Sequence, residues 1–266
     1  MLDEIIAAAL AAGEAILDIY RQDDFAAKVK ADGSPVTEAD ARAEAIILDV
    51  LAKAAPGVPV VAEEAVAAGH IPICGRRFFL VDALDGTKEF LNRNGDFTVN
   101  IALVEEGAPV LGVVYTPVHG DLFVGEAGKG ARRARYAEGR IGDWSAIQVR
   151  QRPSAGLGVV ASRSHLSQET RDFIDRFEVA DLVSAGSSLK FCRVAAGEAD
   201  LYPRLSRTME WDTAAGDAVL RAAGGRVVTL DGKPLAYGKQ EQTEDSAFAN
   251  PWFVACGPFD PLAARP

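Results

Sequence analysis

Two carboxylates at the end of a hydrophobic run are the residues of this sequence best placed for chemistry. Asp82 and Asp85 follow the apolar stretch 78–81 and are followed by Gly86 and Thr87. Carboxylates that bracket a turn converge and repel each other unless a cation lies between them. The same pattern fits a turn with helix-capping acids about equally well. The segment therefore predicts a cation site and leaves a capping turn open.

Two further acidic segments lie upstream and downstream. Glu63 and Glu64 directly follow an expected short strand at 58–62, and alone they fit a solvated acidic turn better than a site. In the segment 211–216, Asp212 opens a helix of small residues, whose N-terminus carries positive potential. An N-cap role for Asp212 is the alternative there.

Together the three segments resemble the inositol monophosphatase superfamily of Mg²⁺-dependent, lithium-sensitive phosphatases. The matching stretches are 82–87, Glu63-Glu64, 211–216 and the second-helix entry at 34–40, in the same order and with similar spacing. The resemblance runs from the first helix to near the carboxyl terminus. Ala83 stands where the superfamily usually has proline, which loosens the turn but leaves the acids in place, so we expect activity to persist.

Other segments are similar to one branch of that superfamily, the CysQ-type 3′(2′),5′-bisphosphate nucleotidases. They are 86–90, 93–95, 97–103, 162–165 and 186–192. This resemblance implies that the substrate is adenosine 3′,5′-bisphosphate, a by-product of sulfate activation, and that its 3′-phosphate is hydrolysed to give AMP and phosphate. The alternatives are an inositol monophosphatase or another small-metabolite phosphatase of the superfamily, and a catalytically silent metal-binding regulatory homologue. The presence of Glu63, Asp82, Asp85 and Asp212 argues against the silent homologue.

The resemblance also implies a two-metal site. Glu63, Asp82 and the Leu84 backbone carbonyl would hold one Mg²⁺, and Asp82, Asp85 and Asp212 would hold a second. Such oxygen ligands suit Mg²⁺, and two ions bridged by one carboxylate can activate water and neutralise the leaving oxygen.

Water activation is the role that the resemblance implies for Glu63 and Thr87. Asp40 lies near a weak third metal in the superfamily. The segment 37–40 also fits a capping box in which Asp40 reaches back to the helix entry, and the two interpretations stand equal.

Substrate contacts are implied for a wider set of residues. The Gly86 and Thr87 amides would take phosphate oxygens, Arg204 would face the 5′-phosphate, and His165 would face the base or sugar. Ordinary surface charge is the alternative for the basic residues, and a loop position is the alternative for His165. The full set is Leu84, Asp85, Gly86, Thr87, His165, Ser187, Lys190, Arg204 and Asp212.

The elements that must position these residues form two halves. In the first half, helical periodicity predicts helices at 2–20 and 37–54, and strands are expected at 58–62, 78–81, 97–104, 110–115 and 121–125, with a Gly/Ala/Arg-rich loop near 125–140. In the second half, strands at 157–161, 199–202 and 226–229 alternate with helices at 168–177, 187–196 and 211–223. We expect an α/β (α+β) protein of two lobes, 1–150 with most metal ligands and 151–266 with Asp212 and the substrate-selecting residues. The resemblance implies a layered αβαβα sandwich.

Composition limits the partners. A formal charge of −10 over 266 residues argues against a nucleic-acid polymer as ligand, since that requires a broad cationic face. An anionic small molecule would instead need local basic residues or a metal. Three widely spaced cysteines, no secretory signal and no long apolar run predict a cytoplasmic protein without a transmembrane segment. Oligomeric state and contact with the inner membrane face stay open.

Overall fold

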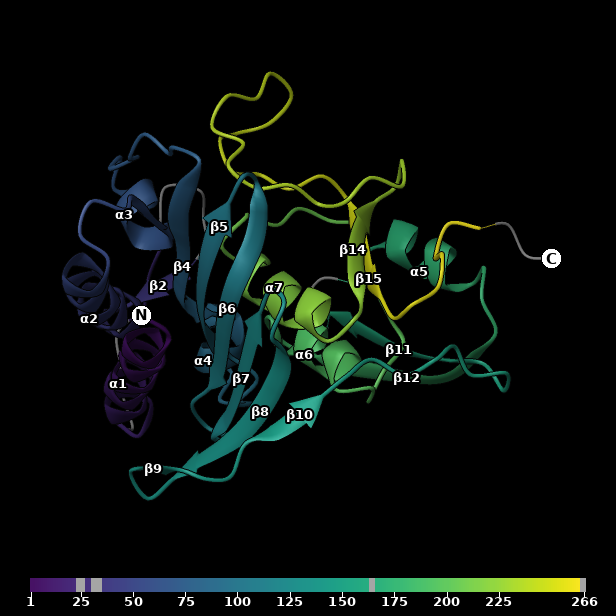
Figure 1. Cartoon of the computed structure of the whole chain (residues 1–266), viewed down its shortest axis with the longest axis horizontal. Coiled ribbons are helices and arrows are strands. Elements are labelled where there is room, and N and C mark those ends of the chain that lie inside the picture. The colour runs from purple at the N-terminus through teal and green to yellow at the C-terminus, as the bar shows by residue number, and fades with distance from the viewer. Residues whose placement is uncertain (23–26, 30–34, 163–165, 264–266) are drawn as a thin grey trace.

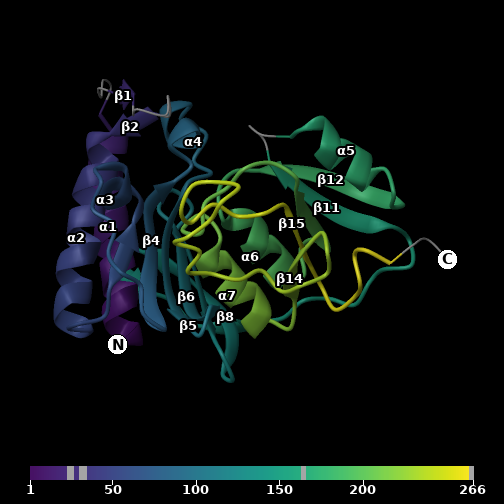
Figure 2. The same cartoon turned by 90° about the horizontal axis from the view of Figure 1, so that it is seen from above.

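The computed structural model describes residues 1–22, 27–29, 35–162 and 166–263, which form a stack of five layers. Two helices cover one face of a large sheet, two more helices separate it from a smaller sheet, and another helix covers the far face of the smaller sheet (Figure 1 and Figure 2). This arrangement confirms the expected α+β class and αβαβα sandwich. A separate small sheet pairs β1 (Ala27–Val29) with β2 (Pro35–Thr37).

The outer layer consists of helices α1 (Leu2–Tyr20) and α2 (Glu38–Ala54), both where the sequence predicts them. The apolar residues of α1 recur at the helical period and pack against the large sheet. A capping box begins α2: the Thr37 hydroxyl accepts a hydrogen bond from the Ala39 N–H, and the Asp40 carboxylate accepts one from the Thr37 N–H.

The large sheet has eight strands in the order β10-β8-β7-β6-β5-β4-β3, with β9 paired to β8. Only β3 and β4 pair in parallel; the other neighbours are antiparallel. The strands are β3 (Val60–Ala62), β4 (Arg77–Asp85), β5 (Thr98–Glu105), β6 (Ala108–Thr116), β7 (Asp121–Glu126), β8 (Gly130–Ala137), β9 (Arg140–Ile141) and β10 (Ser145–Ile147).

Both faces of the large sheet are buried, which explains the continuous apolar run of β4. Phe79 and Val81 pack towards α1 and α2, whereas Phe78 and Leu80 pack towards the inner helices. Successive side chains of a strand point to opposite faces, so every position of this run is used.

The inner layer consists of α6 (Leu189–Ala195) and α7 (Ala214–Ala222), and α7 lies directly on β5, β6 and β7. Two glycines permit this close approach. A Cβ atom at Gly112 would lie 2.4 Å from the Ala215 carbonyl oxygen, and one at Gly125 would lie 2.5 Å from the Val219 Cα. The second half of the chain is thus packed tightly on the sheet of the first half.

The smaller sheet has five strands in the order β12-β11-β13-β15-β14, and α5 packs against its outer face. These elements are β11 (Leu157–Ser162), α5 (Gln168–Ile174), β12 (Val179–Ala185), β13 (Leu201–Arg204), β14 (Arg226–Thr229) and β15 (Phe253–Cys256). Two short helices complete the description, α3 (Glu63–Ala67) and α4 (Thr87–Leu91).

Parts of the fold differ from the prediction. The expected loop near 125–140 is wrong, because most of it forms β8, whose backbone pairs along β7 although Ala131 and Ala134 are its only buried side chains. The strands β12 and β15 were not predicted. Most of β12 is exposed, so its sequence lacks an apolar pattern, whereas β15 is a four-residue buried run between β13 and β14.

The expected division near residue 150 falls between β10 and β11, and it stays a prediction that the two parts are separate lobes. Among the described residues, none of the helices has both the length and the apolar character needed to cross a bilayer.

Candidate active site

A β-bulge in β4 places Asp82 and Asp85 on the same side of the strand. In an unbroken strand, residues three apart point to opposite faces. Here Asp82 pairs with Asn100 and Asp85 pairs with Thr98, so β4 has one more residue than β5 between these pairs. The extra residue turns Asp85 back towards Asp82, and both line one pocket. The strand therefore runs through the two acids, whereas the sequence predicts its end at Val81.

Glu63 reaches the same pocket from the neighbouring strand. Because β3 pairs in parallel with β4, Ala62 lies beside Val81, and the next residues along each strand are Glu63 and Asp82. Glu63 is the first residue of α3, so its side chain leaves the sheet at the strand end. The parallel pairing of β3 and β4 thus brings the two acidic strand ends together.

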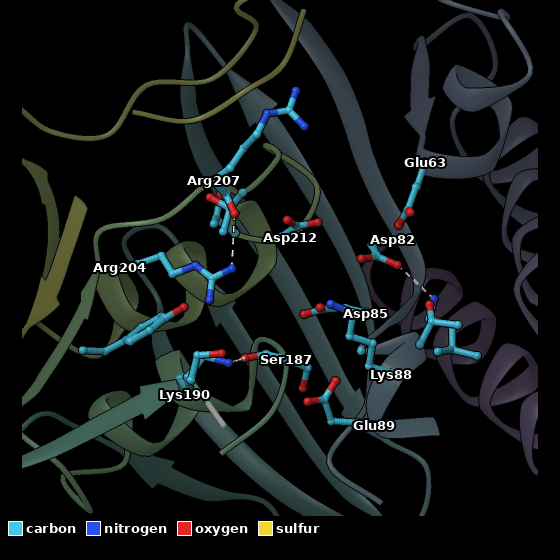
Figure 3. A pocket seen from close by; sticks show the side chains of 17 residues that line it. Glu63, Asp82, Asp85, Lys88, Glu89, Ser187, Lys190, Arg204, Arg207 and Asp212 are labelled. Carbon is cyan, nitrogen blue, oxygen red and sulfur yellow. Dashed lines mark hydrogen bonds between the residues drawn. The ribbon is translucent and has the colours of Figure 1, made fainter. Parts of the chain in front are cut away.

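Asp212 comes from the second half of the chain, in the turn that leads into α7. The N-cap residue of α7 is Thr213, so the alternative of Asp212 as N-cap is wrong. One oxygen of Asp212 accepts a hydrogen bond from the Met209 N–H at 2.8 Å. Carboxylate oxygens of Glu63, Asp82 and Asp212 all lie within 4.8 Å of one another (Figure 3).

Burial and mutual repulsion govern the charge of this cluster. Burial, together with the negative charges of Asp85 and Glu63, raises the pKa of Asp212 to about 8. Burial also raises the pKa of Asp82 well above its usual value, with added repulsion from Glu63 and Asp85. A divalent cation would relieve both effects, and a purely carboxylate donor set suits a hard cation. The residues therefore fit a metal ion.

Asp85 lies outside the group of three and also serves a structural purpose. Its Oδ2 atom accepts hydrogen bonds from the Ser188 N–H at 2.7 Å and from the Asn100 side chain at 3.1 Å, with Thr98 Oγ1 at 3.5 Å. Burial raises the pKa of Asp85, while the Lys190 charge and the hydrogen bonds from Asn100 and Ser188 oppose the rise.

Thr87 and Asp40 contact each other beside the acidic cluster. The Thr87 hydroxyl donates a hydrogen bond to Asp40 Oδ1 at 3.3 Å, while Asp40 Oδ2 serves the capping box of α2. The capping interpretation of Asp40 is thus confirmed, and its place near a third metal stays a prediction. Gly86 precedes Thr87 with φ of 97°, a left-handed conformation that suits glycine and turns the chain from β4 into α4.

Basic residues line the opposite side of the pocket (Figure 3). Lys190 is buried, and its ammonium donates to the Ser187 carbonyl at 2.5 Å. Burial, opposed by the Asp85 charge and strengthened by the Arg204 charge, lowers the pKa of Lys190 to about 8. Arg204 is 8% exposed and donates from Nη2 to the Arg207 carbonyl at 3.2 Å. Within the described structure, Arg204 Nε and Ser187 Oγ are buried without a hydrogen-bond partner. Buried polar atoms are usually hydrogen-bonded, so both atoms are suited to bind a ligand in the pocket.

The pocket has a volume of about 270 Å³ and gathers every predicted site residue that the structure describes. His165 lies outside the described residues. Additional lining residues were not predicted: Lys88, Glu89, Ser162, Tyr202, Arg207, Thr208 and Thr213. The first three belong to segments that the sequence marks as branch-specific. Thr213 directly follows Asp212, and Arg207 and Thr208 lie between Arg204 and Asp212, so proximity in sequence was the signal available for most of them.

Comparison with known proteins identifies this arrangement. The model of the inositol monophosphatase family matches residues 1–254. The chain belongs to this family. Its members use divalent metal ions, in agreement with the acidic cluster.

Within the inositol monophosphatase family, the chain is similar to proteins named 3′(2′),5′-bisphosphate nucleotidase CysQ. The Escherichia coli K12 protein is 44% identical over 257 residues, which cover 95% of this chain and 98% of the relative. The crystal structure of CysQ from Bacteroides thetaiotaomicron has a TM-score of 0.80 and 38% identity and covers 97% of both chains. An inositol monophosphatase from Anabaena has a TM-score of 0.71 and 26% identity over 96% of this chain and 89% of its own.

Proposed function

We propose that this protein is a Mg²⁺-dependent 3′(2′),5′-bisphosphate nucleotidase that converts adenosine 3′,5′-bisphosphate to AMP and phosphate. The observation that carries the proposal is the division of one pocket into an acidic side and a basic side, where Lys190 and Arg204 face the carboxylates. A substrate with two phosphates can use both sides at once. The names of the CysQ relatives support the same activity.

The metal ligands of the proposal come from the start of α3, from β4 and from the turn before α7. Glu63, Asp82 and the Leu84 carbonyl would hold one Mg²⁺, and Asp82, Asp85 and Asp212 would hold a second. Bound Mg²⁺ lowers the pKa of a water molecule and neutralises charge on the phosphoryl and leaving oxygens.

The protein groups around the carboxylates would orient the reactants. Asp40 fixes the Thr87 hydroxyl, which with Glu63 would align the attacking water. The amides of Gly86 and Thr87, at the left-handed turn into α4, would donate hydrogen bonds to oxygens of the reacting phosphate. Positioning of this kind accounts for much of phosphoryl-transfer catalysis.

The basic side would bind the part of the substrate that does not react. Arg204 offers a buried Nε–H for the 5′-phosphate, and its planar fork suits phosphate geometry. Lys190 and Ser187 would contact the same phosphate or the ribose, and His165 would contact the base or sugar. Binding of this second phosphate, which is not cleaved, would distinguish this enzyme from an inositol monophosphatase.

A phosphate-release assay tests the proposal directly. The purified protein is supplied with adenosine 3′,5′-bisphosphate or inositol 1-phosphate, each with Mg²⁺ and with a chelator. We expect Mg²⁺-dependent release from the nucleotide with a much higher kcat/KM than from inositol phosphate. Asp82→Asn controls for contaminating phosphatases. A preference for inositol phosphate would favour the alternative activity within the family, and release from neither substrate would favour a silent homologue.

A further inference from the structure

The short helix that carries Glu63 has no side-chain cap of its own. The N-cap residue of α3 is Ala62, whose side chain cannot accept a hydrogen bond. The first amides of a helix have no partner within the helix and need an acceptor from elsewhere. In α3 these amides belong to the residues directly after Glu63, so their acceptor also fixes the direction in which Glu63 leaves β3.

A carboxylate from another helix supplies this acceptor. Glu44 of α2 accepts hydrogen bonds from the Glu64 N–H at 2.8 Å through one oxygen and from the Ala65 N–H at 2.9 Å through the other. Glu44 is 5% exposed. A buried carboxylate bound by two amides is a firm, charge-assisted contact, and its negative charge also favours the N-terminus of α3.

The same face of α2 supports a second part of the site. Asp40 lies one helical turn before Glu44, so the two side chains emerge one above the other. Asp40 bonds the Thr87 hydroxyl at the start of α4, and Glu44 bonds the start of α3. One rigid helix therefore sets the spacing between Glu63 and Thr87.

We propose that Glu44 is a positioning residue for the metal centre, which acts on Glu63 through the amides of Glu64 and Ala65. This inference rests on the metal site of the proposed function. Loss of the two hydrogen bonds would release the first turn of α3, so that Glu63 would no longer be held within reach of Asp82 and Asp212. Loss of a contact that supports a metal ligand commonly lowers metal affinity or activity roughly 10- to 100-fold.

Metal binding without substrate provides the main readout. Glu44→Gln keeps the size of the side chain but places an NH₂ group against an N–H donor, and Glu44→Ala removes both acceptors. We expect each variant to bind Mn²⁺, measured by calorimetry on the full chain, roughly tenfold or more weakly, and to need correspondingly more Mg²⁺ for half-maximal activity. Asp49→Asn is the matched control, because Asp49 is an exposed carboxylate on the same helix that bonds Lys53.

A compensating substitution separates positioning from general stability. Ala62 has the extended conformation of an N-cap, with φ of −119° and ψ of 142°. Ala62→Ser in the Glu44→Ala background should therefore cap one of the two amides, that of Glu64 or Ala65, and recover part of the Mn²⁺ affinity. No recovery, or unchanged Mn²⁺ affinity in both Glu44 variants despite a lower Tm, would overturn the inference.

The variant Glu63→Gln shows whether a negative result concerns the role of Glu44 alone or the proposed metal site itself. If Glu63→Gln weakens Mn²⁺ binding and the Glu44 variants do not, Glu44 has no positioning role and the metal assignment stands. If Glu63→Gln leaves Mn²⁺ binding unchanged, the metal site itself is wrong, and the inference about Glu44 falls with it.

Discussion

Asp85 Oδ2 accepts a hydrogen bond from the backbone N–H of Ser188 at 2.7 Å, which ties the large sheet to the turn before α6. Asn100 bonds the same oxygen and also donates to the Ser188 hydroxyl at 3.0 Å. The sequence alone does not predict this contact, since Asp85 and Ser188 are far apart in the chain. A residue proposed as a metal ligand is therefore also a connection between the two halves of the structure.

The two purposes of Asp85 can be separated by substitution. Asp85→Asn retains one oxygen that can accept from the Ser188 N–H, but its neutral amide is a poor Mg²⁺ ligand. We expect turnover to be lost while Tm stays close to that of the unchanged protein. Asp85→Ala also removes the acceptor and leaves the Ser188 amide unpaired, so it should cost about 1–3 kcal/mol of stability in addition.

Phosphate release and thermal unfolding of both variants check this prediction. Near-normal activity of Asp85→Asn would contradict a second metal held by Asp85. Equal Tm values for Asp85→Asn and Asp85→Ala would show that the hydrogen bond to Ser188 contributes little to stability.

Stability without a divalent cation should fall as pH rises. The pKa of Asp212 increases from its ordinary 3.8 to about 8 in the folded protein, mainly through burial. The folded state therefore holds a proton that the unfolded state has released, and the stability from this group is fully present below about pH 4 and lost as pH rises to about 8. Asp82, whose pKa is also raised, adds a change of the same sign.

Thermal unfolding with a chelator, followed from about pH 5 to about pH 8, measures this dependence. Mg²⁺ binds the deprotonated acids, so it should raise Tm more at the higher pH. Asp212→Asn cannot ionise and should weaken both trends. A Tm with chelator that rises over this range would contradict the electrostatic description of the cluster.

The packing of α7 offers a test of how Asp212 is held. A methyl group at Gly125 would press against backbone atoms of α7, with the Ala218 carbonyl oxygen at 2.6 Å. The helix would have to shift, so Gly125→Ala should destabilise the protein by about 1–3 kcal/mol and weaken divalent-metal binding. Gly75→Ala is the control, because a Cβ there has no atom within 4 Å. Unfolding and Mn²⁺ titrations on both variants give the comparison, and equal behaviour would contradict the role of this contact.

The long amphipathic and apolar segments made most of the fold predictable. Helices α1 and α2 follow from periodicity because each buries a regular face, and the strands β5 to β7 follow from short apolar runs that are buried on both faces. In contrast, the prediction of a loop at β8 was wrong, since its sequence has no apolar run and pairing with β7, together with ion pairs such as Arg135–Asp121, holds it in the sheet. Such elements depend on a neighbouring strand and leave little trace in their own sequence.

The candidate site, like the fold, was predictable from the sequence only in part. The acidic segments were visible because charge at the end of an apolar run is costly without a partner. The bulge that aligns Asp82 with Asp85 was not visible, because it depends on the register between β4 and β5. Likewise, the contact of Glu44 with the amides of α3 joins two helices whose separation in space the sequence does not encode locally.

The proposed substrate selection depends on Arg204, which lies in the pocket wall opposite the acids. If Arg204 binds the phosphate that is not cleaved, Arg204→Ala should lower kcat/KM for adenosine 3′,5′-bisphosphate far more than for 3′-AMP, which lacks the 5′-phosphate. A remote charge assists only a substrate that carries its counterpart. Loss of a charge-assisted hydrogen bond worth about 1.5–3 kcal/mol corresponds to roughly a tenfold to hundredfold decrease.

The comparison of two substrates is needed because the charge of Arg204 also affects Asp212, a proposed metal ligand. This positive charge lowers the pKa of Asp212, so its removal could disturb the reacting end as well. A disturbance of that kind would reduce kcat/KM for both nucleotides by the same factor, whereas recognition of the second phosphate reduces only one. Arg171→Ala, an exposed arginine of α5 outside the pocket, should change neither value. Equal losses in Arg204→Ala would assign Arg204 to the metal centre and leave the 5′-phosphate contact to Lys190.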